Sequence, residues 1–371
     1  MAAATIRRRR LAAAAGCGLA AGAFAFGAAL GDDSNRAAPS AASRLPLERL
    51  AGQRIVIGFD GAEPPLAVRR MVREGRVAGV ILFDDNFPSR EAGRRLLGGL
   101  QLIPRPPVLR DPLLTMVDQE GGLVKRIGGA PVASAAEMGT VGPMFSREQG
   151  GRTARNLRDL GINVNLAPVL DVARSGGTIK ATERGFGSTA AEVAATAIPF
   201  AEAMQSGGVA ATAKHFPGLG SARVNTDFAA QRIGLSKQTL RQVDEAPYRS
   251  FVAAGGELVM LSTAIYSAFS PLPAALARAI ATGELRSRLG FDGVSITDAL
   301  GAASVRDFGG PAKEGLAAAR AGTDLLLYTD YREAARAHRA LARGLRTGSL
   351  SRAAFEISVG RVLRLRHRLA D

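Results

Sequence analysis

Short runs of apolar residues alternate along the chain with longer segments of helical periodicity. From residue 50 onwards, the runs cover residues 54–59, 77–83, 113–118, 164–172, 209–216, 257–265, 293–298 and 324–328. These runs are continuously apolar rather than alternating, which is typical of parallel strands buried on both faces. Amphipathic helical spacing fills the segments between them, such as residues 65–74, 89–102, 147–160, 190–206, 237–254 and 273–289.

Eight strand–helix units in succession predict an α/β fold, a (β/α)8 TIM-type barrel with a single catalytic domain over residues 47–371. An open doubly wound sheet is the alternative. Its signature is missing, because the first run ends in Gly-Phe-Asp-Gly at 58–61 and the chain contains neither a GxGxxG turn nor a P-loop. The arginine-rich stretches at 334–346 and 353–369 are expected to form the last helices, with His338 and His367 on the surface.

The first 46 residues differ from the rest. Four arginines at 7–10 precede an uncharged stretch, rich in Ala, Gly and Phe, that runs to residue 31. This order predicts an export signal or membrane anchor over residues 1–31 and a flexible linker over residues 32–46. We expect an exported protein, extracellular or associated with the cell envelope. Cleavage, retention as an anchor that attaches the protein to a membrane, and lipidation at Cys17 all stay open.

The overall composition excludes several classes of protein. Hydrophobic residues make up 47% and charged residues 22%, which is typical of a globular chain. One cysteine and three histidines exclude a disulfide scaffold and a thiolate or multi-histidine metal centre. We therefore expect neither a metal nor an organic cofactor.

The formal net charge of +15 raises the question of a nucleic-acid partner. Only five of the 48 basic residues are lysines, which indicates coding bias towards arginine rather than a binding patch. Aromatic residues make up only 5%, and no helix-turn-helix, zinc-finger or RNP-like string is present. We expect a monomer that does not bind nucleic acid.

Polar residues close four of the apolar runs. They are Asp118-Gln119-Glu120, Asp171, Lys214-His215 and Asp298. A single aspartate at such a place is commonly a helix cap or a solvated strand end. Four together indicate a site, because a (β/α)8 barrel carries its chemistry at the carboxyl ends of its strands.

The residue types at these ends permit two chemistries. In the first, Asp298 is a nucleophile on an acetal carbon, for which an ionised carboxylate is suited. In the second, Lys214 forms a Schiff base, as in an aldolase-like barrel. Composition alone does not separate the two.

Several segments together resemble family 3 glycoside hydrolases, specifically the single-domain β-N-acetylglucosaminidases of the NagZ type. KHFPG at 214–218 resembles the family's KHFPGHG signature, and VDQEGG at 117–122 resembles its DQEGG stretch. Further similar segments lie at residues 79–86, 124–126, 166–172, 183–187, 290–300 and 321–327. The resemblance covers nearly the whole of the chain after the leader.

This resemblance implies a barrel that releases terminal β-linked N-acetylglucosamine, or a related sugar, with retention of configuration. Its substrate would be a carbohydrate, such as an amino-sugar glycoside from peptidoglycan fragments. By position, Asp298 would be the nucleophile. The sugar would be bound by Asp118, Arg126, Arg184, Lys214 and His215. Glu120 would brace its loop, and Asp171 would orient Arg184 or Lys214 without touching the sugar.

The chain departs from the family pattern where the family's loop GHG…DxH supplies an Asp–His general acid/base pair. The corresponding residues here are Leu219, Asn225 and Asp227, so the loop has no histidine. Asp227 would serve as the acid/base if it had a raised pKa in a partly desolvated place near Asp298. Alternatively, the protein prefers activated leaving groups, or it is a catalytically impaired sugar-binding protein of the cell envelope.

Overall fold

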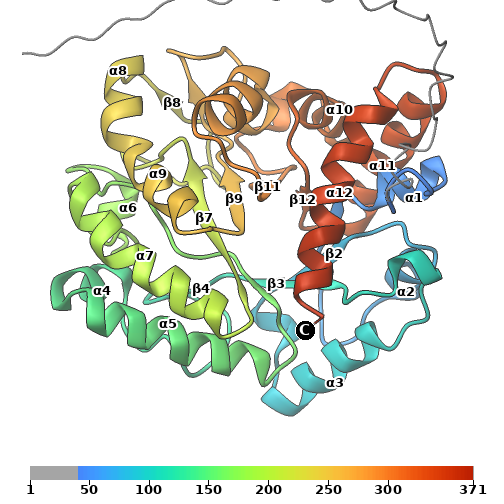
Figure 1. Cartoon of the computed structure of the whole chain (residues 1–371), viewed down its shortest axis with the longest axis horizontal. Helices are drawn as coiled ribbons and strands as arrows, with labels where there is room; N and C mark the ends of the chain where they lie inside the picture. The colour runs from blue at the N-terminus through green and yellow to red at the C-terminus, as the bar shows by residue number, and fades with distance from the viewer. Residues whose placement is uncertain (1–40, 371) are drawn as a thin grey trace, which may run out of the picture. The chain divides into compact units, whose positions relative to one another are not determined.

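Eight parallel strands form a single sheet that closes on itself in the computed structural model (Figure 1). The strands are β1 (Ile55–Ile57), β2 (Gly79–Leu82), β3 (Leu114–Val117), β6 (Val164–Asn165), β7 (Ala210–Phe216), β9 (Leu258–Leu261), β11 (Val294–Thr297) and β12 (Leu326–Tyr328). From β1 to β11, each of these eight strands pairs with the one that follows it in this list, and β12 pairs with β1. Bridges from Ile296 to Leu325 and from Leu300 to Tyr328 complete the ring. The predicted barrel is confirmed.

The structure describes residues 41–370. The expected leader over residues 1–31, Cys17 included, and residues 32–40 of the expected linker lie outside the described residues. Within the described part, no helix is long and apolar enough to cross a membrane.

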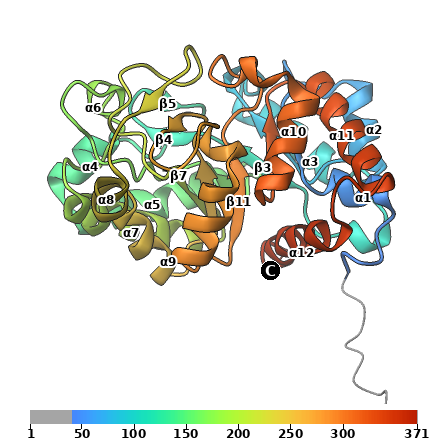
Figure 2. The same cartoon turned by 90° about the horizontal axis from the view of Figure 1, so that it is seen from above.

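Helices surround the strands on the outside of the barrel (Figures 1 and 2). They include α1 (Leu47–Gly52), α2 (Leu66–Arg73), α3 (Arg90–Gln101), α4 (Ala135–Val141), α5 (Pro143–Arg158), α6 (Thr178–Ala181), α7 (Ala190–Ser206), α10 (Pro311–Ala321), α11 (Tyr331–Arg346) and α12 (Arg352–Arg368). Ser89 and Thr189 cap the amino ends of α3 and α7 with their side-chain oxygens. Each of these two helices therefore begins where the periodic pattern predicts.

Two expected helices are interrupted. The segment 237–254 consists of α8 (Lys237–Thr239), a π-helix (Leu240–Asp244) and α9 (Ala246–Ala253). Pro247 lies in the first turn of α9, where its missing N–H is tolerated, so a new helix begins there. The segment 273–289 forms a 3-10 turn (Ala274–Leu276) and a π-helix (Ala279–Arg288).

Helix α12 packs against the barrel at the amino ends of the strands. Its Val362 and Leu365 join the apolar cluster formed by strand residues such as Val56 and Leu114. Arg366 is fully buried and donates to the carbonyl oxygens of Pro112 (2.9 Å) and Leu109 (2.8 Å), both of which precede β3. These contacts leave the carboxyl ends of the strands free to form a site.

A buried ion cluster ties α12 to the strands. Asp324 is fully buried and accepts from Arg361 of α12 at 3.2 Å, from Arg286, and from the backbone N–H of Ser295 at 2.9 Å. Arg54 donates to the backbone oxygen of Asp324 at 3.1 Å. Buried charges persist in proteins when they are paired in this way.

The expectation for His338 is wrong. This residue is only 3% exposed, and its Nε2 lies 2.8 Å from the backbone oxygen of Glu48 in α1. The alanine-rich face of α11 packs against α1 and takes the imidazole inside with it. His367 is exposed on α12, as expected.

Candidate active site

A pocket of about 340 Å³ opens beyond the carboxyl ends of the strands. Its polar lining comprises Asp118, Glu120, Arg126, Arg184, Lys214, His215, Asn225, Asp227 and Asp298. The structure thus brings together every site residue selected from the sequence except Asp171, which is buried behind His215. Residues up to 180 positions apart in the sequence meet here because the ends of parallel strands share one face of a barrel.

A hairpin placed immediately after β3 turns Glu120 into the pocket. It consists of β4 (Gln119–Gly121) and β5 (Val124–Lys125). The buried amide of Gln119 braces it by donating to the backbone oxygens of Ile127 (2.7 Å) and Ala130 (2.9 Å). Gly121 has φ +101°, and a Cβ there would lie 2.2 Å from the backbone oxygen of Ala133, so the turn requires glycine.

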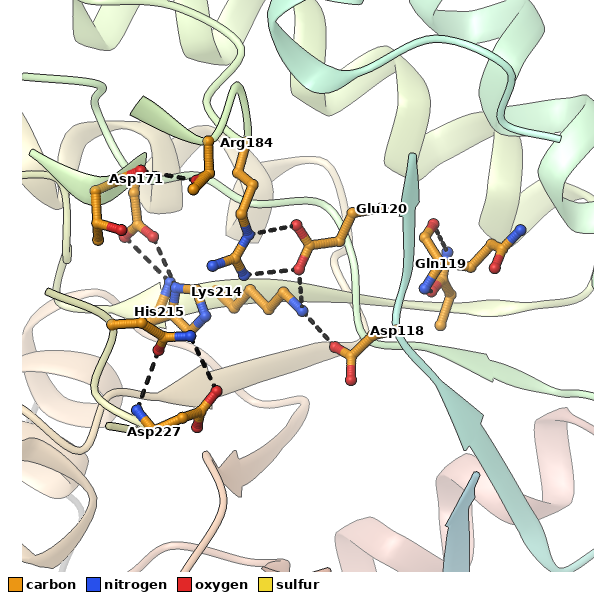
Figure 3. Close-up of polar contacts among 12 residues, drawn as sticks. Asp118, Gln119, Glu120, Asp171, Arg184, Lys214, His215 and Asp227 are labelled. Atoms are coloured by element: carbon orange, nitrogen blue, oxygen red, sulfur yellow. Dashed lines mark hydrogen bonds and ion pairs between the residues drawn. The ribbon is translucent and has the colours of Figure 1, made fainter. Parts of the chain in front are cut away.

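Four charged side chains form a network across the pocket (Figure 3). The ammonium of Lys214 lies 2.6 Å from Asp118 Oδ1 and 2.6 Å from Glu120 Oε1. Arg184 donates to both oxygens of Glu120, from Nε and Nη2, at 2.8 Å each. These ion pairs hold the four side chains in fixed positions relative to one another before any ligand binds.

This pairing decides the charge states. Burial disfavours the charged form of Glu120, but Arg184 and Lys214 outweigh it and hold the pKa of Glu120 well below its ordinary value. Burial likewise opposes the charge of Lys214, but Asp118 and Glu120 raise the pKa of Lys214 above its usual value. A Schiff-base lysine needs a neutral amine. The aldolase-like alternative is therefore disfavoured.

Asp171 orients His215 rather than Arg184 or Lys214. Its Oδ2 lies 2.7 Å from the imidazole Nδ1, and its Oδ1 accepts from the backbone N–H groups of His215 (3.2 Å) and Leu219 (2.6 Å). A carboxylate only accepts hydrogen bonds, so Nδ1 carries the proton. One fully buried side chain thereby fixes both the imidazole and the turn formed by the KHFPG segment at 214–218.

Asp298 follows β11 directly and is half-buried at the pocket wall. The backbone N–H of Ala299 donates to its Oδ1 at 2.8 Å. Burial raises the pKa of Asp298, and the negative charge of Asp227 raises it further, while His215 lowers it. Asp227 is therefore close enough to Asp298 for its charge to act on the carboxyl group of Asp298.

Asp227 lines the same pocket but is exposed, in contrast to the partly desolvated place expected from the sequence. Asn225 donates to Asp227 Oδ2 and accepts from its backbone N–H, both at 3.1 Å. The loop is also joined to the segment after Asp298, because Ala303 N donates to Asp227 O at 3.3 Å. The two carboxylates therefore sit on loops that are hydrogen-bonded to each other.

The apolar part of the lining was not selected from the sequence. It includes Ile81, Phe83, Leu166, Met260 and Leu327, which lie in or directly after four different strands. A usable signal existed, because side chains at alternate positions near a strand's carboxyl end face the barrel interior. Within residues 41–370, no group of three or more His, Cys, Asp or Glu side chains could hold a metal ion.

Taken together, these groups suit work on an acetal of a polyhydroxylated substrate. Two carboxylates share one pocket, and Lys214, Arg184 and Asp118 can donate to or accept from ring hydroxyls. The apolar side chains can contact the carbon-bound hydrogens of a sugar ring. The fold and the site define the class of barrel hydrolases that cleave glycosidic bonds.

Comparison with known proteins gives the family. The model of the glycosyl hydrolase family 3 N terminal domain matches residues 48–365. This chain belongs to glycoside hydrolase family 3 and is a glycosidase.

Three relatives illustrate the similarity. An uncharacterized secreted glycosyl hydrolase of Arthroderma benhamiae is 37% identical over 90% of this chain and 96% of its own length. A beta-hexosaminidase of Alkalilimnicola ehrlichii is 32% identical over 76% of this chain and 81% of its own length. The structure of a family 3 β-N-acetylglucosaminidase from Paenibacillus sp. superimposes with a TM-score of 0.84 and 33% identity. That match covers 88% of this chain and 63% of the Paenibacillus chain.

The effect of Asp227 on the pKa of Asp298 predicts a change in the pH dependence of activity. Asp227→Asn removes the negative charge that raises the pKa of Asp298. A nucleophilic carboxylate must be ionised, so a lower pKa lets Asp298 work at lower pH. The acidic limb of the kcat/KM profile for an activated aryl glycoside should therefore move to lower pH. Asp159→Asn, an exposed residue directly after α5 that adjoins no residue of the pocket, is the control. An acidic limb that stays in place in Asp227→Asn would contradict the coupling.

Proposed function

We propose that the protein is a retaining glycoside hydrolase that releases terminal β-linked N-acetylglucosamine, or a closely related sugar. The observation that supports this most directly is that Asp298 and Asp227 line one small pocket together with the charged network around Lys214. The names of similar proteins, a beta-hexosaminidase and a β-N-acetylglucosaminidase, agree with an amino-sugar substrate. A pocket of about 340 Å³ suits one terminal sugar ring.

In the proposed reaction, Asp298 attacks the anomeric carbon and forms a glycosyl–aspartate ester. The bond to the leaving oxygen breaks, and that oxygen takes a proton from an acid on the opposite side of the ring. Water then attacks the same carbon, gives up a proton to the conjugate base and frees Asp298. Lys214 and His215 lower the pKa of Asp298 and would thus favour the ionised nucleophile.

The charged side chains of the network would bind the sugar. Lys214 and Arg184 would donate to ring hydroxyls, Asp118 would accept from them, and His215 would present its Nε2. Arg126 has a buried Nε without a hydrogen-bond partner in the pocket wall, which makes it a further donor for the substrate. Asp171 and Glu120 would hold these groups without reacting themselves.

We assign the acid/base role to Asp227. The family's histidine is absent from this loop, and Asp227 is the carboxylate of the loop that lines the same pocket as Asp298. Asn225 fixes its orientation through two hydrogen bonds. A bound sugar would cover the exposed carboxylate and exclude water from it. The competing candidate is a sugar-binding protein with impaired catalysis, which the exposure of Asp227 in this structure favours.

We further propose that residues 1–31 direct export, with the barrel acting outside the cytoplasm. The arginine run followed by an apolar stretch supports this, as does the similarity to a secreted glycosyl hydrolase. The expected result is barrel protein in the medium or the envelope fraction of the native host. A version lacking residues 1–31 should stay in the cytoplasm. Retention of both versions in the cytoplasm would refute export.

Replacing the nucleophile gives the first test of the mechanism. Asp298→Asn keeps the shape of the side chain but cannot form the ester, so kcat for an aryl β-N-acetylglucosaminide should fall about a thousandfold or more. Sugar affinity, measured by calorimetry, should persist. Asp159→Asn again serves as the control. Turnover by Asp298→Asn at the wild-type rate would remove Asp298 from the mechanism, and a wild type that binds sugar but cleaves no glycoside would establish the binding-protein alternative.

The acid/base assignment is tested by varying the leaving group. Asp227→Ala should lower kcat/KM about a hundredfold or more for aglycones that leave poorly, because these need proton donation at the glycosidic oxygen. Activated aglycones, such as dinitrophenolate, should be affected far less in the first step. Added azide should rescue turnover of the activated substrates by replacing base-assisted water. Equal losses for both kinds of aglycone would indicate that Asp227 has only a structural role.

A further inference from the structure

The pocket holds one sugar, so the remainder of any longer substrate must lie outside it. Its volume of about 340 Å³ is near the lower limit for ligand pockets, and its polar groups converge on a single place. The proposed acid, Asp227, must reach the glycosidic oxygen that links this sugar to the next unit. The surface bordering Asp227 is therefore where the aglycone must lie.

Phe228 occupies that border. It follows Asp227 directly and is 78% exposed. Among residues 41–370, it is the one aromatic side chain in the set of strongly exposed large apolar residues. The others, such as Leu102 and Met144, are aliphatic. Exposing an aromatic ring to water costs free energy that a ligand covering the ring would recover.

The backbone beneath this ring is held in place. Phe228 N donates to Asn225 O at 3.1 Å, which closes a tight turn. Ser304 N donates to Thr226 O at 3.3 Å, which ties the turn to the loop that follows Asp298. The ring therefore lies on a loop that contains Asp227 and is hydrogen-bonded to the segment after Asp298.

A second apolar side chain also lies at the edge of the pocket. Leu123, at the tip of the β4–β5 hairpin, is 76% exposed and precedes Val124, which lines the pocket. By contrast, Leu102 at the end of α3 is 82% exposed but adjoins no lining residue. Single exposed apolar residues are common on protein surfaces. Phe228 and Leu123 both adjoin residues that line the pocket, and Phe228 is the aromatic one of the two.

We propose that Phe228 forms a binding site for the aglycone and that its preferred occupant is a second pyranose ring. The face of a pyranose presents carbon-bound hydrogens with partial positive charge, which complement the negative face of an aromatic ring. This inference rests on the proposed glycosidase function. It narrows the substrate class to β-linked oligosaccharides, in preference to small alkyl glycosides.

The test compares two substrates that share the glycosyl group but differ in the leaving group. One is a β-linked disaccharide of N-acetylglucosamine, and the other is the corresponding β-glycosyl fluoride, which has no aglycone ring. In Phe228→Ala, the ratio of kcat/KM for the disaccharide to kcat/KM for the fluoride should fall about fivefold to tenfold. Phe228→Tyr should restore the ratio, because it keeps the aromatic face. Leu102→Ala removes an equally exposed side chain elsewhere and is the matched control.

Each outcome decides a different point. A wild type that cleaves neither substrate would refute the proposed function. A wild type that cleaves both, with the same ratio in Phe228→Ala, would refute the aglycone site and leave the function intact. A fall in the ratio that Phe228→Tyr does not reverse would also refute it, because the effect would then not come from an aromatic face.

Discussion

The ammonium of Lys214 lies between two carboxylates inside the mouth of the barrel, and the organisation of the site depends on it. Without Asp118 and Glu120, the buried charge would be unfavourable, and without Lys214 the two carboxylates would repel each other. Arg184 extends the pairing through Glu120. The network is therefore stable only as a whole, which preorganises groups from three separate segments for a polar ligand.

The barrel makes this pairing available, because it gathers the carboxyl ends of eight strands on one face. Helix α12 packs at the opposite ends of the strands, where buried Arg366 and Asp324 are fully occupied with structural partners. The buried structural ion pairs thus lie at the amino ends of the strands, and the candidate site lies at their carboxyl ends. Loops at the catalytic end can vary in sequence while the frame that holds Lys214 stays intact.

The loop that carries Asp227 shows such variation. It lacks the histidine of the resembled pattern, and Asn225 and Asp227 form a hydrogen-bonded pair in its place. This loop depends on the segment after Asp298 for its position, since backbone hydrogen bonds join the two. The exposure of Asp227 and Phe228 leaves both side chains to be covered by substrate. The bound ligand itself would then shield these two side chains from water.

The sequence by itself determined the barrel, because continuous apolar runs separated by amphipathic segments leave few other ways to bury their surface. It also selected nine polar site residues, and eight of the nine line one pocket. Only the tertiary structure decided which groups pair, since pairing depends on distances between residues such as Asp118 and Lys214, 96 positions apart. It likewise decided that Asp171 holds His215, that His338 is buried and that Asp227 is exposed. Burial and contacts depend on how different elements pack against one another. The hydrophobic periodicity of a single element therefore does not predict them.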